Sequence, residues 1–186
     1  MRALSTAKRL NRHEPAAKAA VLSSLGVIVL LAGSALLTVF TGGYNVAATQ
    51  LHTPVVGGGL NSALHNSGER RAGDIATPPE FTRAMIESGA SEYKEYCAHC
   101  HGGVGKGRAD WVADMRPHPP ALARTANQWS EREVFWMVKH GIKMSGMPAF
   151  GPNHDDQTLW NITAFVKAMP NMTAEEYDSF EGGYEH

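Results

Sequence analysis

Two absences limit what this chain can be: it has very few cysteines, and its second half has no excess of basic residues. Its 186 residues include only Cys97 and Cys100 as cysteines, so a zinc site built from two cysteine pairs is excluded. Residues 81–186 contain ten Lys and Arg against fourteen Asp and Glu. Such a balance gives no basic surface for a phosphate backbone, and we expect no nucleic-acid partner.

Charge is missing altogether from residues 19–68. Within this stretch, residues 19–40 are apolar enough and long enough for a helix that rises about 1.5 Å per residue to cross the roughly 30 Å hydrocarbon core of a bilayer. We therefore predict a single transmembrane anchor at residues 19–42. Residues 1–18 carry five basic residues against one acidic residue, which predicts a cytoplasmic amino terminus and a periplasmic remainder at the inner membrane of a bacterium.

A cleaved signal peptide is the alternative interpretation of the same segment. Its apolar core is usually about 7–15 residues long, which is shorter than the run found here. Residues 46–48, Val-Ala-Ala, would nevertheless suit a cleavage site. Both interpretations export the remainder of the chain to the same compartment.

Both cysteines lie in the pentapeptide Cys97-Ala98-His99-Cys100-His101. Two thiols at this spacing, followed at once by a histidine, are typical of covalent haem attachment, with the imidazole of His101 offered to the iron. A dithiol redox motif would be expected in a βαβ context, which the sequence lacks. Half of a zinc site and a plain disulfide are the remaining alternatives.

Helix signals dominate the rest of the chain and predict an all-α fold. Thr77 with Glu80 resembles a capping box that would open the domain, and Ala90, Tyr93 and Cys97 share one helical stripe, with Lys94 pointing elsewhere. Ser130 with Glu133 predicts a second box before a helix that ends at Gly141. A last helix should begin at residues 154–156 and end before Pro170. Its expected apolar face comprises Leu159, Trp160, Ile162, Thr163, Phe165 and Val166.

The segments between these helices are expected to be irregular. Residues 43–76 form a periplasmic linker, either a flexible tether or a short helix around residues 60–71 that lies at the membrane surface. The glycines of residues 102–107 are expected to let the backbone approach the haem edge, and the prolines of residues 117–120 to form an extended wall. His118 between these prolines is expected at the surface or at a haem propionate. Residues 77–170 would be the haem domain, followed by an acidic tail, 171–186, that is either solvated or a docking strip for a basic partner.

Met147 is the candidate for the second iron ligand. It lies between Gly146 and Pro148, and the proline favours extended backbone at Met147. A thioether is a soft ligand that suits low-spin haem iron. Packing in the core is the other common fate of a methionine, and Met144 is the runner-up ligand, with Met137 and Met172 also available.

Together, residues 97–102 and 146–150 resemble the corresponding motifs of class I monohaem cytochromes c. The resemblance covers about residues 88–169 and includes a terminal helix with Trp160. It implies one haem c with its iron, thioethers to Cys97 and Cys100, and axial ligation by His101 and Met147. It also implies three to five helices around the haem, with the first and last crossing near Gly89 or Ala90 and Trp160.

These features predict a membrane-anchored electron carrier rather than an enzyme, because two axial ligands leave no open position on the iron. Its expected partners are respiratory redox proteins: a quinol-oxidising complex, a dehydrogenase or a terminal oxidase. A fixed haem subunit of a membrane-bound dehydrogenase or oxidase complex is the alternative function. A ligand-binding sensor or haem enzyme with a labile distal methionine is a third.

Overall fold

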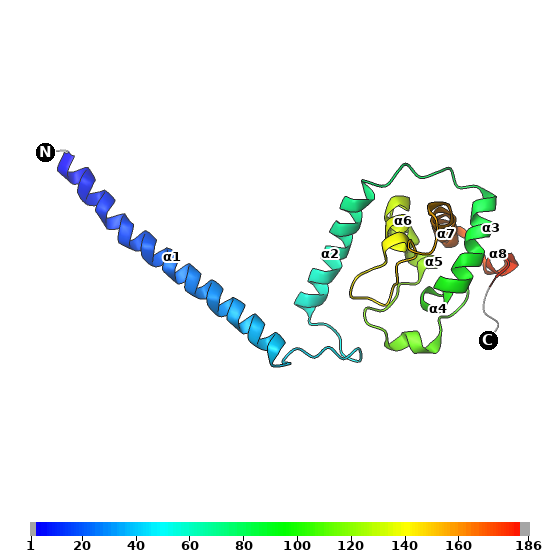
Figure 1. The fold of residues 1–186 in the computed structure, drawn as a ribbon, viewed down its shortest axis with the longest axis horizontal. Coiled ribbons are helices and arrows are strands. Elements are labelled where there is room, and N and C mark those ends of the chain that lie inside the picture. The colour runs from blue at the N-terminus through cyan, green and yellow to red at the C-terminus, as the bar shows by residue number, and fades with distance from the viewer. Residues whose placement is uncertain (1–2, 183–186) are drawn as a thin grey trace. The chain divides into compact units, whose positions relative to one another are not determined.

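The computed structural model describes residues 3–182 and confirms the predicted all-α class, since these residues form helices and no strand (Figure 1). They divide into two compact units, residues 1–47 and 48–186. The α-helices are α1 (Ala3–Phe40), α2 (Pro54–Ala72), α3 (Arg83–Glu92), α4 (Ala98–His101), α5 (Leu122–Thr125), α6 (Glu131–His140), α7 (Asp156–Ala168) and α8 (Ala174–Ser179). A π-helical turn, Tyr93–Cys97, joins α3 to α4, and 3₁₀ turns occur at Asp110–Asp114, Ala126–Gln128 and Met169–Asn171.

Helix α1 contains the one segment of the described residues, Pro15–Phe40, that is long and apolar enough to cross a membrane, with a mean hydropathy of 2.3. Its large apolar side chains are exposed: Leu30 is 71% and Phe40 is 83% accessible. A helix that is apolar all round needs apolar surroundings. Length and composition suit both a membrane anchor and a signal sequence near the amino terminus.

The second unit is organised around the crossing of α3 with α7. Gly89 of α3 lies so close to α7 that a Cβ atom added there would be 1.9 Å from the carbonyl oxygen of Asn161. The two backbones can approach this closely only because residue 89 has no side chain. The crossing expected at Gly89 therefore exists, and Trp160, next to Asn161, stacks on Phe135 with ring centroids 4.1 Å apart.

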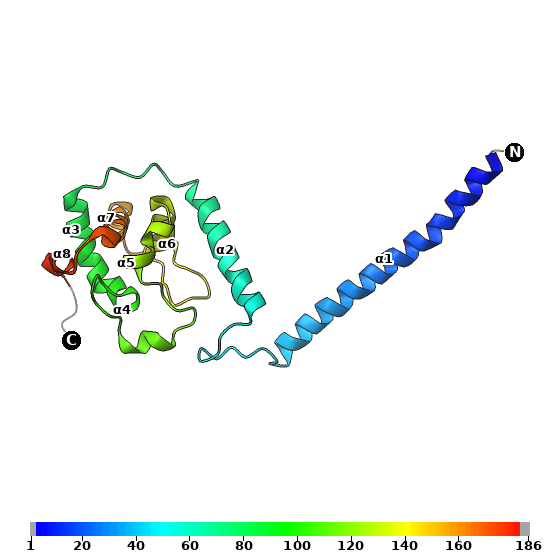
Figure 2. The same ribbon diagram turned by 180° about the vertical axis from the view of Figure 1, so that it is seen from behind.

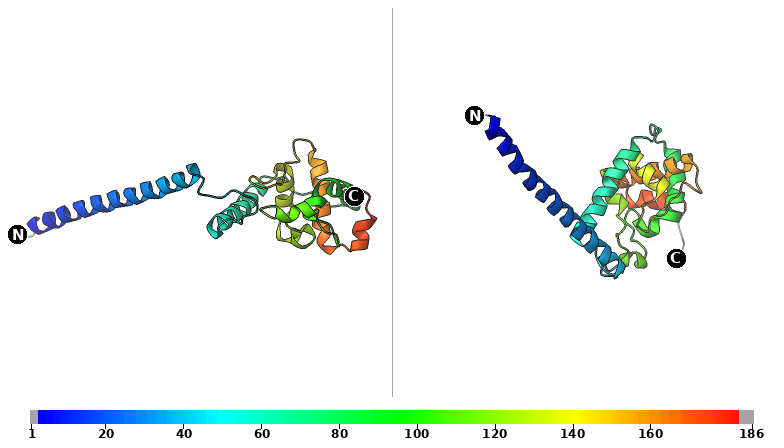
Figure 3. Two further views of the ribbon diagram at one scale, coloured as in Figure 1. Left: turned by 90° about the horizontal axis from the view of Figure 1, so that it is seen from below. Right: turned by 60° about the vertical axis from the view of Figure 1, so that its left-hand side comes forward.

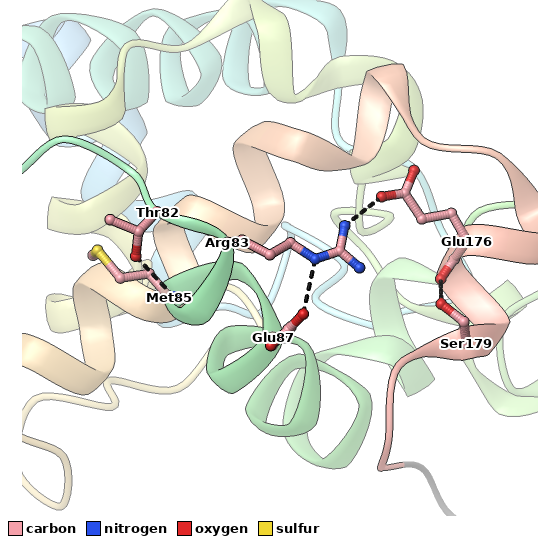
Figure 4. A network of polar contacts seen from close by, with 6 residues as sticks. All are labelled: Thr82, Arg83, Met85, Glu87, Glu176 and Ser179. Carbon is pink, nitrogen blue, oxygen red and sulfur yellow. Dashed lines mark hydrogen bonds and ion pairs between the residues drawn. The ribbon is translucent and has the colours of Figure 1, made fainter.

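The start of α3 differs from the prediction. Residues 77–80 are not helical, and the helix begins at Arg83, where the Thr82 side chain accepts a hydrogen bond of 3.3 Å from the Met85 N–H (Figure 4). The capping box expected at Thr77 is wrong because the two prolines that follow it keep the chain extended until the next threonine.

The other two helix starts are as predicted. Ser130 and Glu133 form a reciprocal capping box at α6, which ends at Gly141. Asp155 caps α7 by accepting a 2.8 Å hydrogen bond from the Thr158 N–H. The apolar face expected on α7 is buried, and it comprises Leu159, Trp160, Ile162, Thr163, Phe165 and Val166.

The linker is more ordered than a flexible tether. Helix α2 packs on α6, next to which it lies in Figures 1 and 2 and in both views of Figure 3. The His65 ring stacks on Trp129 with centroids 4.3 Å apart, and Gly68 is buried against the same indole. The alternative of a helix in this region is thus the better one, although the helix is longer than expected.

The expectation of a solvated acidic tail is wrong for residues 171–180. Tyr177 and Phe180 belong to the buried core, and Lys94, expected to point outward, is buried and donates a hydrogen bond to the Phe180 carbonyl. The Arg83 guanidinium forms ion pairs with the carboxylates of Glu87 at 2.9 Å and Glu176 at 2.8 Å, and the second pair connects α3 to α8 (Figure 4). Aromatic burial outweighs the acidic composition here. The rest of the tail, residues 183–186, lies outside the described residues.

Candidate haem site

The two cysteines lie at the end of the helix that crosses α7. Cys97 closes the π-helical turn and Cys100 lies in α4, and π-turns often occur at functional sites. Both residues are partly buried free thiols. Burial, together with the neighbouring Cys100 and Glu92, raises the pKa of Cys97 to about 12, and burial also raises the pKa of Cys100. Both sulfurs are therefore protonated thiols at neutral pH, and no disulfide joins them.

His101, the last residue of α4, is oriented by a backbone hydrogen bond. Its Nδ1 lies 2.8 Å from the carbonyl oxygen of Pro120. A carbonyl only accepts, so Nδ1 carries the proton and Nε2 keeps its lone pair. Burial lowers the pKa of His101, against a raising effect of the Pro120 bond. The imidazole is consequently neutral near pH 7, which is the form that binds a metal.

Tyr93 fixes the backbone just after His101. Its side chain is fully buried, and its hydroxyl donates a 2.7 Å hydrogen bond to the carbonyl of Gly102. Burial raises the pKa of Tyr93 well above its ordinary value, so the hydroxyl remains a donor. The helical stripe that identified Tyr93 as a core residue gave no sign of this bond.

The glycine loop after His101 lies against α8. A Cβ atom added at Gly103 would be 2.5 Å from the Tyr177 ring, and one at Gly105 would be 2.9 Å from the Ala174 Cβ. These glycines allow α8 to approach the loop, a contact that the sequence did not indicate. The predicted contact of the loop with a haem edge stays a prediction.

Met147 lies in the loop between α6 and α7 and packs against the same apolar core as Cys97. Its N–H donates to Ser145 Oγ at 3.2 Å, and its carbonyl accepts from the Ile142 N–H at 3.2 Å. The runner-up, Met144, is 73% exposed and has a left-handed backbone with φ of 62°. The other two alternatives, Met137 and Met172, are buried in the core.

Two neighbours of the site were not found from the sequence. The Met115 side chain reaches the loop that contains Met147: its Cε would be 2.2 Å from a Cβ atom at Gly146. The Pro120 carbonyl is a backbone acceptor, for which no residue type is diagnostic. Residues 117–120 form neither helix nor strand, as predicted, and the chain bends at the cis Arg116–Pro117 peptide bond. His118 is exposed and contacts Arg108.

A surface hollow of about 750 Å³ lies beside the haem motif, between the glycine loop and α8. Ala98, His99 and Tyr177 contribute to its lining. None of the four residues predicted to hold the haem does so. The hollow adjoins the haem motif through Ala98 and His99.

The residues present fit a covalently bound haem c. Two free thiols are available for thioethers, one neutral imidazole has Nε2 unprotonated, and one thioether lies in a loop against the same core as Cys97. Among the described residues no group of three or more His, Cys, Asp and Glu side chains could hold a metal ion by itself. The two thiols would hold the haem c macrocycle, and the imidazole and the thioether would ligate its iron.

The segment that contains the candidate site matches a known protein family. Residues 84–166 match the family model described as cytochrome C oxidase, cbb3-type, subunit III, a match that spans less than half of the chain. Comparison with curated proteins gives no match. Among solved structures, a chain of the Kuenenia stuttgartiensis reducing HAO-like protein complex is similar with 22% identity and a TM-score of 0.46, over 50% of this chain and 47% of that chain.

The match supports a c-type cytochrome domain over this segment. It contains both cysteines, His101 and Met147. A domain of this class binds haem c covalently, through its iron-containing macrocycle, and functions in haem-based electron transfer. Covalent haem attachment accounts for the cysteine pair, whereas a zinc site or a disulfide does not.

Proposed function

We propose that the chain is a membrane-anchored periplasmic electron carrier whose haem c is held by Cys97 and Cys100 and ligated by His101 and Met147. The observation that carries the proposal is the partly buried, neutral His101 ring, held by the Pro120 carbonyl directly after two free thiols. When bound, the haem iron supplies one-electron chemistry. Its partners would be respiratory redox proteins that dock briefly at a small surface.

The chain's own residues orient the site. His101 presents Nε2, because Nδ1–H is committed to Pro120. Met147 is positioned by two backbone bonds and the apolar core. Two protein ligands would leave no position on the iron for a substrate, and an apolar, rigid surround favours electron transfer over catalysis.

Carbon monoxide binding tests the axial pair. We expect the reduced full-length protein to bind carbon monoxide slowly or not at all, because Met147 fills the distal position. Rapid binding by the folded protein would overturn the carrier proposal and favour a sensor or haem enzyme with a labile methionine. The absorption spectrum of the reduced protein, recorded after mixing, measures this directly.

The anchor is tested by truncation. Removing residues 1–40 and supplying a cleavable export signal should give a soluble haem protein, since Pro15–Phe40 is the one long apolar helix of the described residues. The full-length chain should remain with the membrane fraction at high salt. A full-length chain that is recovered soluble and shortened would show that the segment is a signal peptide instead.

A fixed haem subunit of a membrane-bound oxidase or dehydrogenase is the second candidate. The description of the matching family, an oxidase subunit, supports it. Purification in mild detergent separates the two functions: a stoichiometric partner that stays bound through washing would establish the subunit, whereas a monomeric haem protein would establish the carrier. An anchor would serve either role by confining the domain near membrane partners.

A further inference from the structure

The second unit leaves large apolar side chains exposed at the point where the chain enters it. Leu51 is 79% and Val55 is 85% accessible, and Val56 is exposed as well. Single exposed apolar residues are common in soluble domains, whereas a contiguous group marks a surface that contacts a protein or a membrane. These three residues lie within six consecutive positions, so they form such a group.

The two halves of α2 have different surroundings. The second half packs on the haem domain, because the His65 ring stacks on Trp129 and Gly68 is buried against the same indole. The first half begins at Pro54 and carries the exposed Val55. The helix predicted at the membrane surface around residues 60–71 is therefore largely held by the domain, and the exposed apolar residues precede it.

A second segment lies beside the start of α2. Leu51, Gly57 and Ala113 all line one hollow of about 520 Å³. Ala113 belongs to the 3₁₀ turn Asp110–Asp114, which lies with the start of α2 on the lower side of the second unit in Figures 1 and 2. This turn carries Trp111, which is 60% exposed, and tryptophan is enriched at membrane–water interfaces. Leu51, Val55 and Trp111 together form what we call the entry edge.

Charge is absent from the chain on both sides of Leu51 and Val55. Residues 19–68 contain no Asp, Glu, Lys or Arg, and this uncharged run begins within the apolar segment Pro15–Phe40. An ionised side chain is costly to move out of water, and this stretch has none to move. The uncharged character of the predicted anchor thus continues into the start of α2.

The length of chain between α1 and the entry edge limits how far this edge can lie from a membrane. Leu51 follows Phe40, the last residue of α1, by eleven residues, which span at most about 40 Å when fully extended. An anchor at residues 19–42 would keep the edge within reach of the bilayer and raise its effective concentration there. A lipid surface is therefore the partner that the chain itself supplies.

We propose that the entry edge rests in the phospholipid surface of the membrane, at the boundary between headgroups and acyl chains. The inference rests on the membrane anchor of the proposed function. Leu51 and Val55 insert among the acyl chains, whereas Asp110 and Asp114, which are exposed, stay at the level of the headgroups, so the contact is shallow. Because α2 packs on α6, a contact at the start of α2 fixes the orientation of the haem domain on the bilayer.

Spin labels on the full-length, haem-loaded protein test this contact in vesicles of phosphatidylcholine and phosphatidylglycerol. Leu51→Cys and Val55→Cys place a label on the entry edge, and Glu175→Cys places the control label at an exposed position of α8. At positions 51 and 55 the label should collide more often with oxygen, which concentrates in lipid, than with a water-soluble nickel chelate. At position 175 the order should be reversed.

Two results would overturn the proposal. One is access of the nickel chelate to positions 51 and 55 that equals its access to position 175, because the edge would then lie in water. The other is low access of both oxygen and the chelate to positions 51 and 55, because a second copy of the chain would then cover the edge.

Cross-linking of the wild-type protein decides the matter if the labelled variants fail to fold. A phospholipid with a photoactivatable acyl chain should attach to peptides that contain residues 48–56 and not to peptides from α8. Attachment to residues 19–40 alone would overturn the proposal.

The same samples separate this inference from the proposed function. Wild-type protein that takes up spin label would contradict the thioethers at Cys97 and Cys100, and a chain recovered soluble and shortened would contradict the anchor. A chain that stays in the vesicles while its labels at positions 51 and 55 lie in water would contradict the contact of the entry edge alone.

Discussion

His101 and Met147 lie in surroundings of different character. On the His101 side, α4 follows a helix packed tightly on α7, the ring is tied to Pro120, and the next carbonyl is tied to buried Tyr93. On the Met147 side, the side chain lies in a loop without regular structure, held by two bonds of 3.2 Å and by contacts with the core. The first side is fixed by helix packing and the second by loop geometry.

This difference assigns separate tasks to the two sides. Rigid helix packing suits a side that must present two thiols and an imidazole in fixed register for covalent attachment. A loop can be displaced at lower cost, because it has fewer buried contacts. We therefore expect changes on the His101 side to affect haem retention and folding, and changes on the Met147 side to affect potential and ligand access.

The largest effect is expected from removing both thiols. Cys97→Ser with Cys100→Ser should abolish covalent haem, because a hydroxyl does not form the thioether. Acid–acetone extraction followed by a haem stain of the separated protein measures this. His118→Ala, at an exposed position of the proline-rich segment, is the control and should retain the haem. Covalent haem in the double variant would contradict the role of the two cysteines.

Replacing Met147 is the corresponding test of the other side. Met147→Ala should lower the potential, a shift within the about 0.8 V range over which axial ligands act, and should admit carbon monoxide while the haem stays attached. Met144→Ala, which alters an exposed side chain, should do neither. Met115→Ala, which changes the other methionine beside the loop, should keep the methionine–iron band. A reversal between Met147 and either control would reassign the ligand.

A smaller effect, on stability, is expected at the helix crossing. Gly89→Ala places a Cβ 1.9 Å from the Asn161 carbonyl oxygen and should destabilise the domain by about 1–3 kcal/mol, or prevent folding, because the two backbones must separate. Gly107→Ala meets no atom within 4 Å and should change stability by less than about 0.5 kcal/mol. Urea unfolding of the haem-loaded truncated domain compares them. Similar midpoints would show that the crossing is not rigid.

The smallest effect is expected at the start of α6, the helix that leads into the Met147 loop. Ser130→Ala removes the side chain that accepts from the Glu133 N–H and should cost about 1 kcal/mol. The loss should appear in urea unfolding and leave the reduction potential unchanged, since the cap lies at the far end of α6 from Met147. A changed potential would indicate that the two ends of α6 are coupled.

Short-range signals in the sequence were sufficient for much of this protein. Capping at Ser130, the start of α7 within residues 154–156, the stop at Gly141 and the apolar face of α7 were all predicted, because each depends on residues a few positions apart. The haem motif was found for the same reason, since its chemistry depends on the spacing of five consecutive residues. Met147 was chosen from its proline neighbour, and its role stays a prediction.

Only the tertiary structure shows the contacts whose partner is distant in the chain or is a backbone group. The Pro120 carbonyl at His101 and the Tyr93 bond to Gly102 have no local pattern. The sequence predicted a linker where α2 lies and a solvated end where the aromatic residues of the tail lie. It did so because Gly-rich and acidic composition predicts local flexibility. In the structure, α2 packs on Trp129 and the aromatic residues of the tail pack in the core. Both segments are therefore ordered, because the free energy of packing depends on the surface that a residue meets rather than on its neighbours in sequence.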